Sequence, residues 1–122
     1  MRTTMASWLL IVGLALSPQA DAAPPTKVQI EVNFLLGYLE GSGCEFYRNG
    51  SWHDSNAAQE HLRDKYNYLV AKDQVNSTEA FIDSAATQSS LSGEAYAVKC
   101  AGAATMSSNQ WLRDELARFR KF

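Results

Sequence analysis

The sequence predicts a small α+β domain in which about four helices pack with a small antiparallel sheet. Three observations lead to this fold class. Apolar residues recur at helical spacing in four segments, and two short strand-like stretches flank an Asn-Gly pair. One more alternating stretch follows a Ser-rich loop. The sheet is therefore expected to be a hairpin plus one strand, with its helices packed against it.

The first helix is expected over residues 27–40. This segment starts with strand-like alternation, but the longer period favours a helix. Four apolar residues share one face at that period: Val28, Val32, Leu35 and Leu39. The glycines of residues 41–43 end the helix.

A hairpin is expected next. Residues 44–48 form its first strand and residues 51–53 its short return strand. Asn49 and Gly50 form the turn, because both tolerate the positive φ of a type I′ turn.

Two helices follow the hairpin. Asp54 or Ser55 caps the first, which runs to about Lys72. Its buried stripe comprises Ala58, Leu62, Tyr66 and Leu69. Residues 76–79, Asn-Ser-Thr-Glu, resemble a capping box before the second helix. The inward residues of that helix are Phe81, Ile82, Ala85 and Ala86.

The last segments are a loop, a strand, a link and a helix. Residues 89–93 form the loop, and residues 95–100 alternate as a strand with Tyr96, Val98 and Cys100 on one face. Residues 101–106 are expected to be a flexible link. The final helix starts at Ser107, three residues before Gln110, and its stripe comprises Leu112, Leu116 and Phe119.

Residues 1–22 have the order of a secretory signal peptide. Arg2 gives a positive start, an apolar run covers residues 8–16, and Ala20-Asp21-Ala22 is a small-residue cleavage site. The run is far shorter than the roughly 20 residues that span a bilayer. The alternative is an N-terminal core helix. We predict export, cleavage after Ala22 and one domain over residues 23–122.

Composition excludes several classes of function. The net charge of -2 argues against nonspecific nucleic-acid binding, which needs a basic surface. The basic end at residues 118–121 is explained as favourable charge at a helix C-terminus. Without a C-x-x-C motif, two cysteines and two distant histidines predict neither a metal site nor a redox site. No cofactor is expected.

Cys44 and Cys100 are expected to form a disulfide, since an even pair in an oxidising compartment is usually bonded. Their Cα atoms should then lie within about 7 Å. A bridge between neighbouring antiparallel strands places Phe46 near Val98 and Arg48 near Tyr96.

Several ordered motifs resemble a known family. These are Phe46-Tyr47-Arg48-Asn49-Gly50, His61-Leu62-Arg63-Asp64-Lys65, Glu79-Ala80-Phe81-Ile82, and Ser89-Ser90-Leu91-Ser92-Gly93 with Tyr96. They are similar to the YfeK-like family of small bacterial periplasmic proteins, classed as a domain of unknown function. The resemblance extends from about Phe34 to Arg120. It implies a periplasmic location and a Gram-negative source, but it transfers no activity.

One polar cluster is a candidate site. His61 and Lys65 lie four residues apart on one helix face, and Arg48 ends the strand expected to face that helix. With the Ser89–Gly93 loop they could hold a carboxylate or a phosphate. The alternative is a structural brace at a seam between helix and sheet. We expect the brace, with the Ser loop partly exposed at its edge.

Two further features are weaker. A Ser of the loop with His53 or His61 could form a nucleophile pair, but the chain has no G-x-S-x-G elbow. His53 beside Asp54 suggests a relay, although Asp54 is better explained as a helix cap. Trp52 marks either a contact surface or a cover for one side of the sheet.

These features favour a non-enzymatic periplasmic binding or interaction module, with an unknown periplasmic protein or envelope component as its partner. The alternatives are a small hydrolase that uses a Ser/His pair and an immunity-type inhibitor of a periplasmic toxin. Nine residues are candidates for binding: Arg48, Asn49, Trp52, His61, Lys65, Ser89, Ser90, Ser92 and Tyr96.

Overall fold

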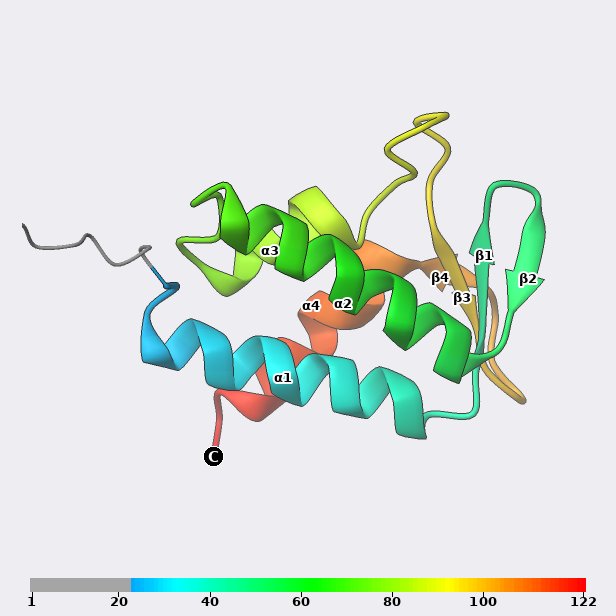
Figure 1. Cartoon of the computed structure of the whole chain (residues 1–122). Coiled ribbons are helices and arrows are strands. Elements are labelled where there is room, and N and C mark those ends of the chain that lie inside the picture. Colours follow the sequence, from blue (N-terminus) through cyan, green and yellow to red (C-terminus); the bar gives the residue numbers. More distant parts are fainter. Residues whose placement is uncertain (1–22) are drawn as a thin grey trace, which may run out of the picture.

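The computed structural model describes residues 23–122; the expected signal peptide, residues 1–22, lies outside the described residues. Four helices and four strands make up this part of the chain (Figure 1). In order, they are α1 (Thr26–Gly41), β1 (Glu45–Arg48), β2 (Ser51–His53), α2 (Ser55–Ala71), α3 (Thr78–Ala85), β3 (Ala97–Lys99), β4 (Met106–Ser107) and α4 (Ser108–Phe119). The predicted α+β class is confirmed.

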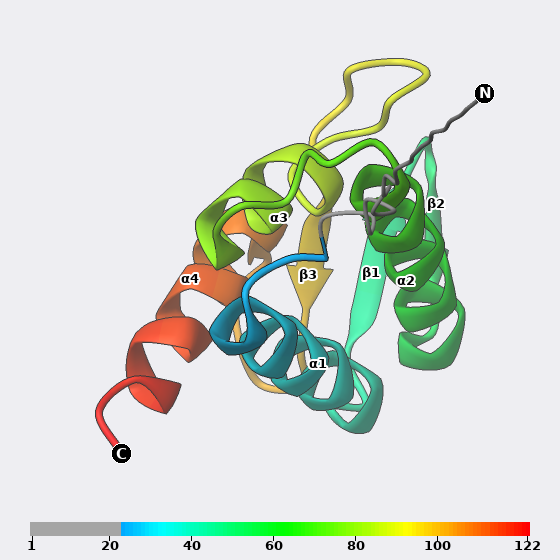
Figure 2. The same cartoon turned by 60° about the vertical axis from the view of Figure 1, so that its left-hand side comes forward.

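The strands form one antiparallel sheet in the order β2-β1-β3-β4. The helices lie on one side of it, and α1 and α2 run side by side in both views (Figures 1 and 2). The fourth strand is a correction, because residues 101–106 were expected to be a link. β4 has two residues, so it is too short to show an alternating pattern in the sequence.

The hairpin turn is confirmed. Asn49 has φ 50° and Gly50 has φ 86°, which is the pair of positive φ angles that a type I′ turn requires. The turn sets the register Phe46 to His53, so Phe46, His53 and Arg48 point to the helix side of the sheet.

The apolar stripes predicted for the helices form most of the core. Its fully enclosed members include Val32, Leu35 and Leu39 of α1 and Phe81 and Ile82 of α3. The predicted stripe of α2 is buried at Leu62 and Tyr66, while Ala58 and Leu69 are half-buried at its edges. This core fixes α2 over the sheet.

The predicted disulfide is confirmed. Cys44 and Cys100 are bonded, with their Cα atoms 4.4 Å apart. The register also pairs Phe46 with Val98, and both side chains are buried as expected. The bridge therefore anchors the β1–β3 pair that places Arg48 on the same face as Tyr96.

Side-chain caps begin three helices. Asp54 accepts from the Ala57 N–H at 2.8 Å, and Ser107 accepts from the Gln110 N–H at 3.1 Å. Ser77 accepts from the Ala80 N–H at 3.0 Å. The capping box expected over residues 76–79 is wrong in its second half, because the Glu79 carboxylate binds Arg120 instead.

An ion-pair network holds the end of the helices far from the hairpin (Figure 1). Arg120 donates to Glu31 at 2.8 and 2.9 Å and to Glu79 at 2.6 Å. The Thr78 hydroxyl donates to Glu31 at 2.6 Å. The Arg120 hydrogen bonds hold the pKa of the buried Glu31 carboxyl down at about 2.

Candidate functional site

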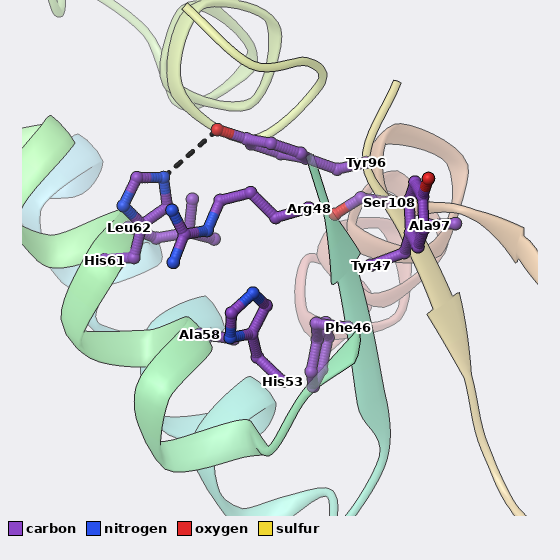
Figure 3. A pocket seen from close by; sticks show the side chains of 10 residues that line it. All are labelled: Phe46, Tyr47, Arg48, His53, Ala58, His61, Leu62, Tyr96, Ala97 and Ser108. Atoms are coloured by element: carbon purple, nitrogen blue, oxygen red, sulfur yellow. Dashed lines mark hydrogen bonds between the residues drawn. The ribbon is translucent and has the colours of Figure 1, made fainter. Parts of the chain in front are cut away.

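The predicted polar cluster assembles where α2 crosses the sheet. α2 contributes His61 and Lys65, β1 contributes Arg48, and Tyr96 lies just before β3. Figure 3 shows Arg48 reaching from β1 toward α2, with its guanidinium beside the His61 ring. Residues distant in the sequence therefore meet here because the β1–β3 pairing and the burial of Leu62 require it.

Tyr96 is the centre of a hydrogen-bonded brace. Its hydroxyl lies 3.1 Å from Nε2 of His61 and accepts from the Lys65 ammonium at 3.2 Å. Lys65 also donates to the Gln88 carbonyl at 3.2 Å and lies 5.0 Å from the centre of the Tyr96 ring. Because Lys65 already donates to the hydroxyl oxygen, the phenol hydrogen is free for the neutral imidazole. These contacts tie α2 to the segment before β3.

Arg48 lies beside this brace but is not part of it. Within residues 23–122, its guanidinium makes no hydrogen bond and no ion pair, although the side chain is half-buried. It lines a small pocket that is partly open to solvent. The pocket is lined by Phe46, Tyr47, Arg48, His53, Ala58, His61, Leu62, Tyr96, Ala97 and Ser108 (Figure 3).

Ser108 is a second polar group of the pocket wall. Only 3% of the residue is exposed, and its hydroxyl has no hydrogen-bond partner in the described chain. It occupies the first turn of α4, where Ser107 already provides the cap and the Ser108 N–H donates to the Tyr96 carbonyl. The pocket thus holds two sets of hydrogen-bonding groups that the described residues leave unused.

Positive charge dominates the electrostatics of the pocket. Burial, then the charges of Arg48 and Lys65, hold the pKa of His61 below its usual 6.5, against an opposing effect of Asp64. Burial and the Arg48 charge likewise lower the pKa of Lys65. His61 is therefore neutral at pH 7, and the arrangement resists added positive charge.

The Ser loop is built as a turn. Ser89 is buried, and its hydroxyl accepts from the N–H groups of Leu91 and Ser92 at 3.1 and 3.2 Å. Ser92 donates to Asn49 Oδ1 at 2.7 Å, which links the loop to the hairpin turn. Ser90 lines a separate depression beside His61 and Lys65. No hydrogen bond within residues 23–122 joins a serine of this loop to a histidine.

Trp52 lies away from the pocket, on the other face of the sheet. It is 43% exposed and packs edge-to-face on Tyr47 with ring centres 5.3 Å apart. The Tyr47 hydroxyl donates to Glu94 at 3.0 Å, and this bond raises the pKa of Tyr47. Asp54, the suggested relay partner of His53, is the α2 cap instead.

Sequence reasoning missed Ser108 and the apolar wall of the pocket. A signal for Ser108 was present, because the chain has two adjacent serines where a helix needs one cap. Phe46, Ala58 and Leu62 were identified only as core or strand residues. Their second role depends on how α2 crosses β1, which no local pattern specifies.

The described residues contain no cluster of three His, Cys, Asp or Glu residues that could bind a metal ion. In the same part of the chain, no helix is long and apolar enough to cross a membrane.

Comparison with known families assigns the chain to one family. The model of DUF5329, a family of unknown function, matches residues 26–120. The chain belongs to this family. The DUF5329 match covers every helix and strand described above, together with both cysteines. No curated protein matches the chain, and no solved structure matches it either.

Proposed function

We propose that this DUF5329 protein is a non-enzymatic binding module of the periplasm, and that it holds an anionic group of its partner at Arg48. One observation carries the proposal: a half-buried guanidinium lines a pocket that also contains a buried serine hydroxyl, and neither group has a partner within residues 23–122. A buried donor left unsatisfied costs free energy, so such groups normally have partners.

The chemistry of arginine supports an anionic ligand. The guanidinium stays charged and presents five N–H donors in a planar fork that matches carboxylate and phosphate oxygens. The first turn of α4 lies at the same pocket through Ser108, and helix N-termini carry partial positive charge. No carboxylate of residues 23–122 neutralises Arg48 in the way that Glu31 neutralises Arg120.

Export is part of the same proposal. The signal-like order of residues 1–22 and the Cys44–Cys100 disulfide support it, because disulfides persist in oxidising compartments. The resemblance to YfeK-like proteins favours the periplasm of a Gram-negative cell.

The two alternative functions have less support. The hydroxyls of Ser89 and Ser92 serve the turn and the hairpin link, and Ser90, which shares a depression with His61, has no hydrogen bond to it within residues 23–122. An immunity-type inhibitor would need a surface shaped for a toxin.

A titration of the protein with small anions tests the proposal. Amide chemical shifts of the ¹⁵N-labelled residues 23–122 are followed as acetate, phosphate or sulfate replaces chloride at constant ionic strength. We expect saturable shifts around the pocket that disappear in Arg48→Gln. Arg63→Gln is the matched control, because Arg63 is an α2 arginine bonded to Asn33, away from the pocket. Equal responses in both variants would refute the proposal.

A further inference from the structure

We infer that the group bound at Arg48 is a monocarboxylate carried on a short apolar substituent. This inference rests on the proposed function and specifies its ligand. The proposal follows from three properties of the pocket: the free charge, the free hydroxyl and the apolar wall.

The free charge favours a monoanion over a phosphate dianion. The basic residues of the pocket lining are Arg48, His53 and His61; Arg48 is the permanently charged one, and it has no partner within residues 23–122. Lys65 already donates to Tyr96 and Gln88, and His61 is neutral at pH 7. One guanidinium neutralises one carboxylate through two parallel hydrogen bonds. A phosphate dianion would keep excess charge and several unsatisfied oxygens.

The free hydroxyl belongs to Ser108. A serine hydroxyl both donates and accepts, so it can donate to an oxygen of a carboxylate held by Arg48. Such a contact would give this buried group the partner that it lacks within residues 23–122.

The apolar wall favours a hydrocarbon substituent. Phe46, Ala58 and Leu62 face the pocket from β1 and α2, and Ala97 adds to the lining. The pocket is small and part of its space is open to solvent, so the substituent must be short. Burying each methylene strengthens binding by about fourfold.

Two sources present this chemistry: a free short-chain acid and the C-terminus of a protein that ends in a small apolar residue. Both place a carboxylate next to a short hydrocarbon group, and the peptide titration below separates them.

Calorimetric titration tests the ligand class. Acetate, propionate, isobutyrate and inorganic phosphate are titrated into residues 23–122 at pH 7. We expect affinity to rise by about fourfold for each methylene buried along the carboxylate series, with isobutyrate binding more tightly than phosphate. Arg48→Gln should weaken all the carboxylates by tenfold or more. Ala58→Leu, which fills the pocket from α2, should weaken isobutyrate several-fold more than acetate.

Different failures identify which statement is wrong. Tighter binding of phosphate, lost in Arg48→Gln, would leave the anion site standing and overturn the carboxylate inference. Equal affinities for acetate and isobutyrate would overturn the apolar substituent. If Arg48→Gln changes the affinity for none of these anions, both the inference and the proposed function are refuted.

A second arm separates the sources. A tetrapeptide ending in valine is titrated with a free and with an amidated C-terminus. Binding of the free form at least as tightly as isobutyrate supports a protein C-terminus. Binding of isobutyrate alone supports a small acid. Equal binding of the amidated form would overturn the carboxylate inference.

Discussion

Two arginines at opposite ends of the domain have contrasting surroundings. Arg120, whose side chain is 36% exposed, is shared by the carboxylates of Glu31 and Glu79, and Thr78 completes the network. Arg48 is half-buried beside His61 and has no carboxylate partner among the described residues. Each arginine lies where elements distant in the chain meet, but within residues 23–122 only Arg120 has its charge neutralised.

The difference separates two uses of charge. At the Arg120 end, acid and base stabilise each other, so the pKa of Glu31 falls to about 2. At the Arg48 end, the pKa values of His61 and Lys65 are lowered, first by burial and then by the positive charge of Arg48. The first arrangement stabilises the fold, and we propose that an anion from outside completes the second.

The largest expected loss of stability comes from removing the disulfide. The Cys44→Ser, Cys100→Ser double variant should lose about 4 kcal/mol of unfolding free energy in the chain-entropy model. Urea unfolding of the oxidised protein and of the variant gives the difference. Because the bridge holds β1 against β3, binding at Arg48 should weaken as well. Unchanged stability would show that the bridge is dispensable for the fold.

Arg120→Ala should lower the free energy of unfolding by about 2 kcal/mol. This loss is smaller than the ~3–5 kcal/mol expected for breaking a fully buried ion pair, because water reaches the partly exposed Arg120 side chain. The loss leaves Glu31 charged and buried with Thr78 as its hydrogen-bond partner. Arg48→Ala should change stability by less than about 0.5 kcal/mol. Urea midpoints of the two variants compare the two ends directly, and equal losses would remove the contrast.

Acid unfolding should reveal the Glu31 network. The folded pKa of Glu31 is about 2, below its ordinary 4.5, so its contribution is present above pH 4.5 and is lost as the pH falls toward 2. Unfolding free energies measured from pH 7 to pH 2.5 should therefore decline below pH 4.5, and less steeply in Arg120→Ala. Parallel curves for the two proteins would contradict this assignment.

His61→Ala should have a smaller effect, a loss of about 1 kcal/mol at pH 8, because its hydrogen bond to Tyr96 disappears while Lys65 still donates to the hydroxyl. The loss should shrink at pH 5, because a His with a lowered folded pKa stabilises the fold above pH 6.5 and less below it. The charged and titratable groups that act on or contact this ring are Arg48, His53, Asp64, Lys65 and Tyr96. A constant difference from pH 8 to pH 5 would contradict the lowered pKa.

Most of the fold could be predicted because its signals are local. The Asn49-Gly50 turn, the Asp54 and Ser107 caps and the apolar stripe of α1 each depend on a few adjacent or periodic residues. The two-residue strand β4 could not be predicted, since its pairing is set by the position of β3 rather than by a pattern of its own.

The candidate site was predicted only in part. The sequence indicated that Arg48, His61 and Lys65 would converge, because the disulfide fixes the strand that carries Arg48 and a buried Leu62 fixes the face of α2. It could not indicate that Tyr96 would engage His61 and Lys65 while Arg48 has no partner within residues 23–122. Which of these side chains form hydrogen bonds depends on distances between residues of three different segments.

Urea unfolding of the wild type and Arg48→Gln, each with and without isobutyrate at pH 7, tests the central claim that Arg48 serves binding and Arg120 serves folding. Without the acid, the two proteins should unfold at nearly the same midpoint. With the acid at 100 times its Kd, only the wild type should gain stability, by about 2.7 kcal/mol. A large loss of stability in Arg48→Gln without ligand, or an equal gain in both proteins, would contradict the account.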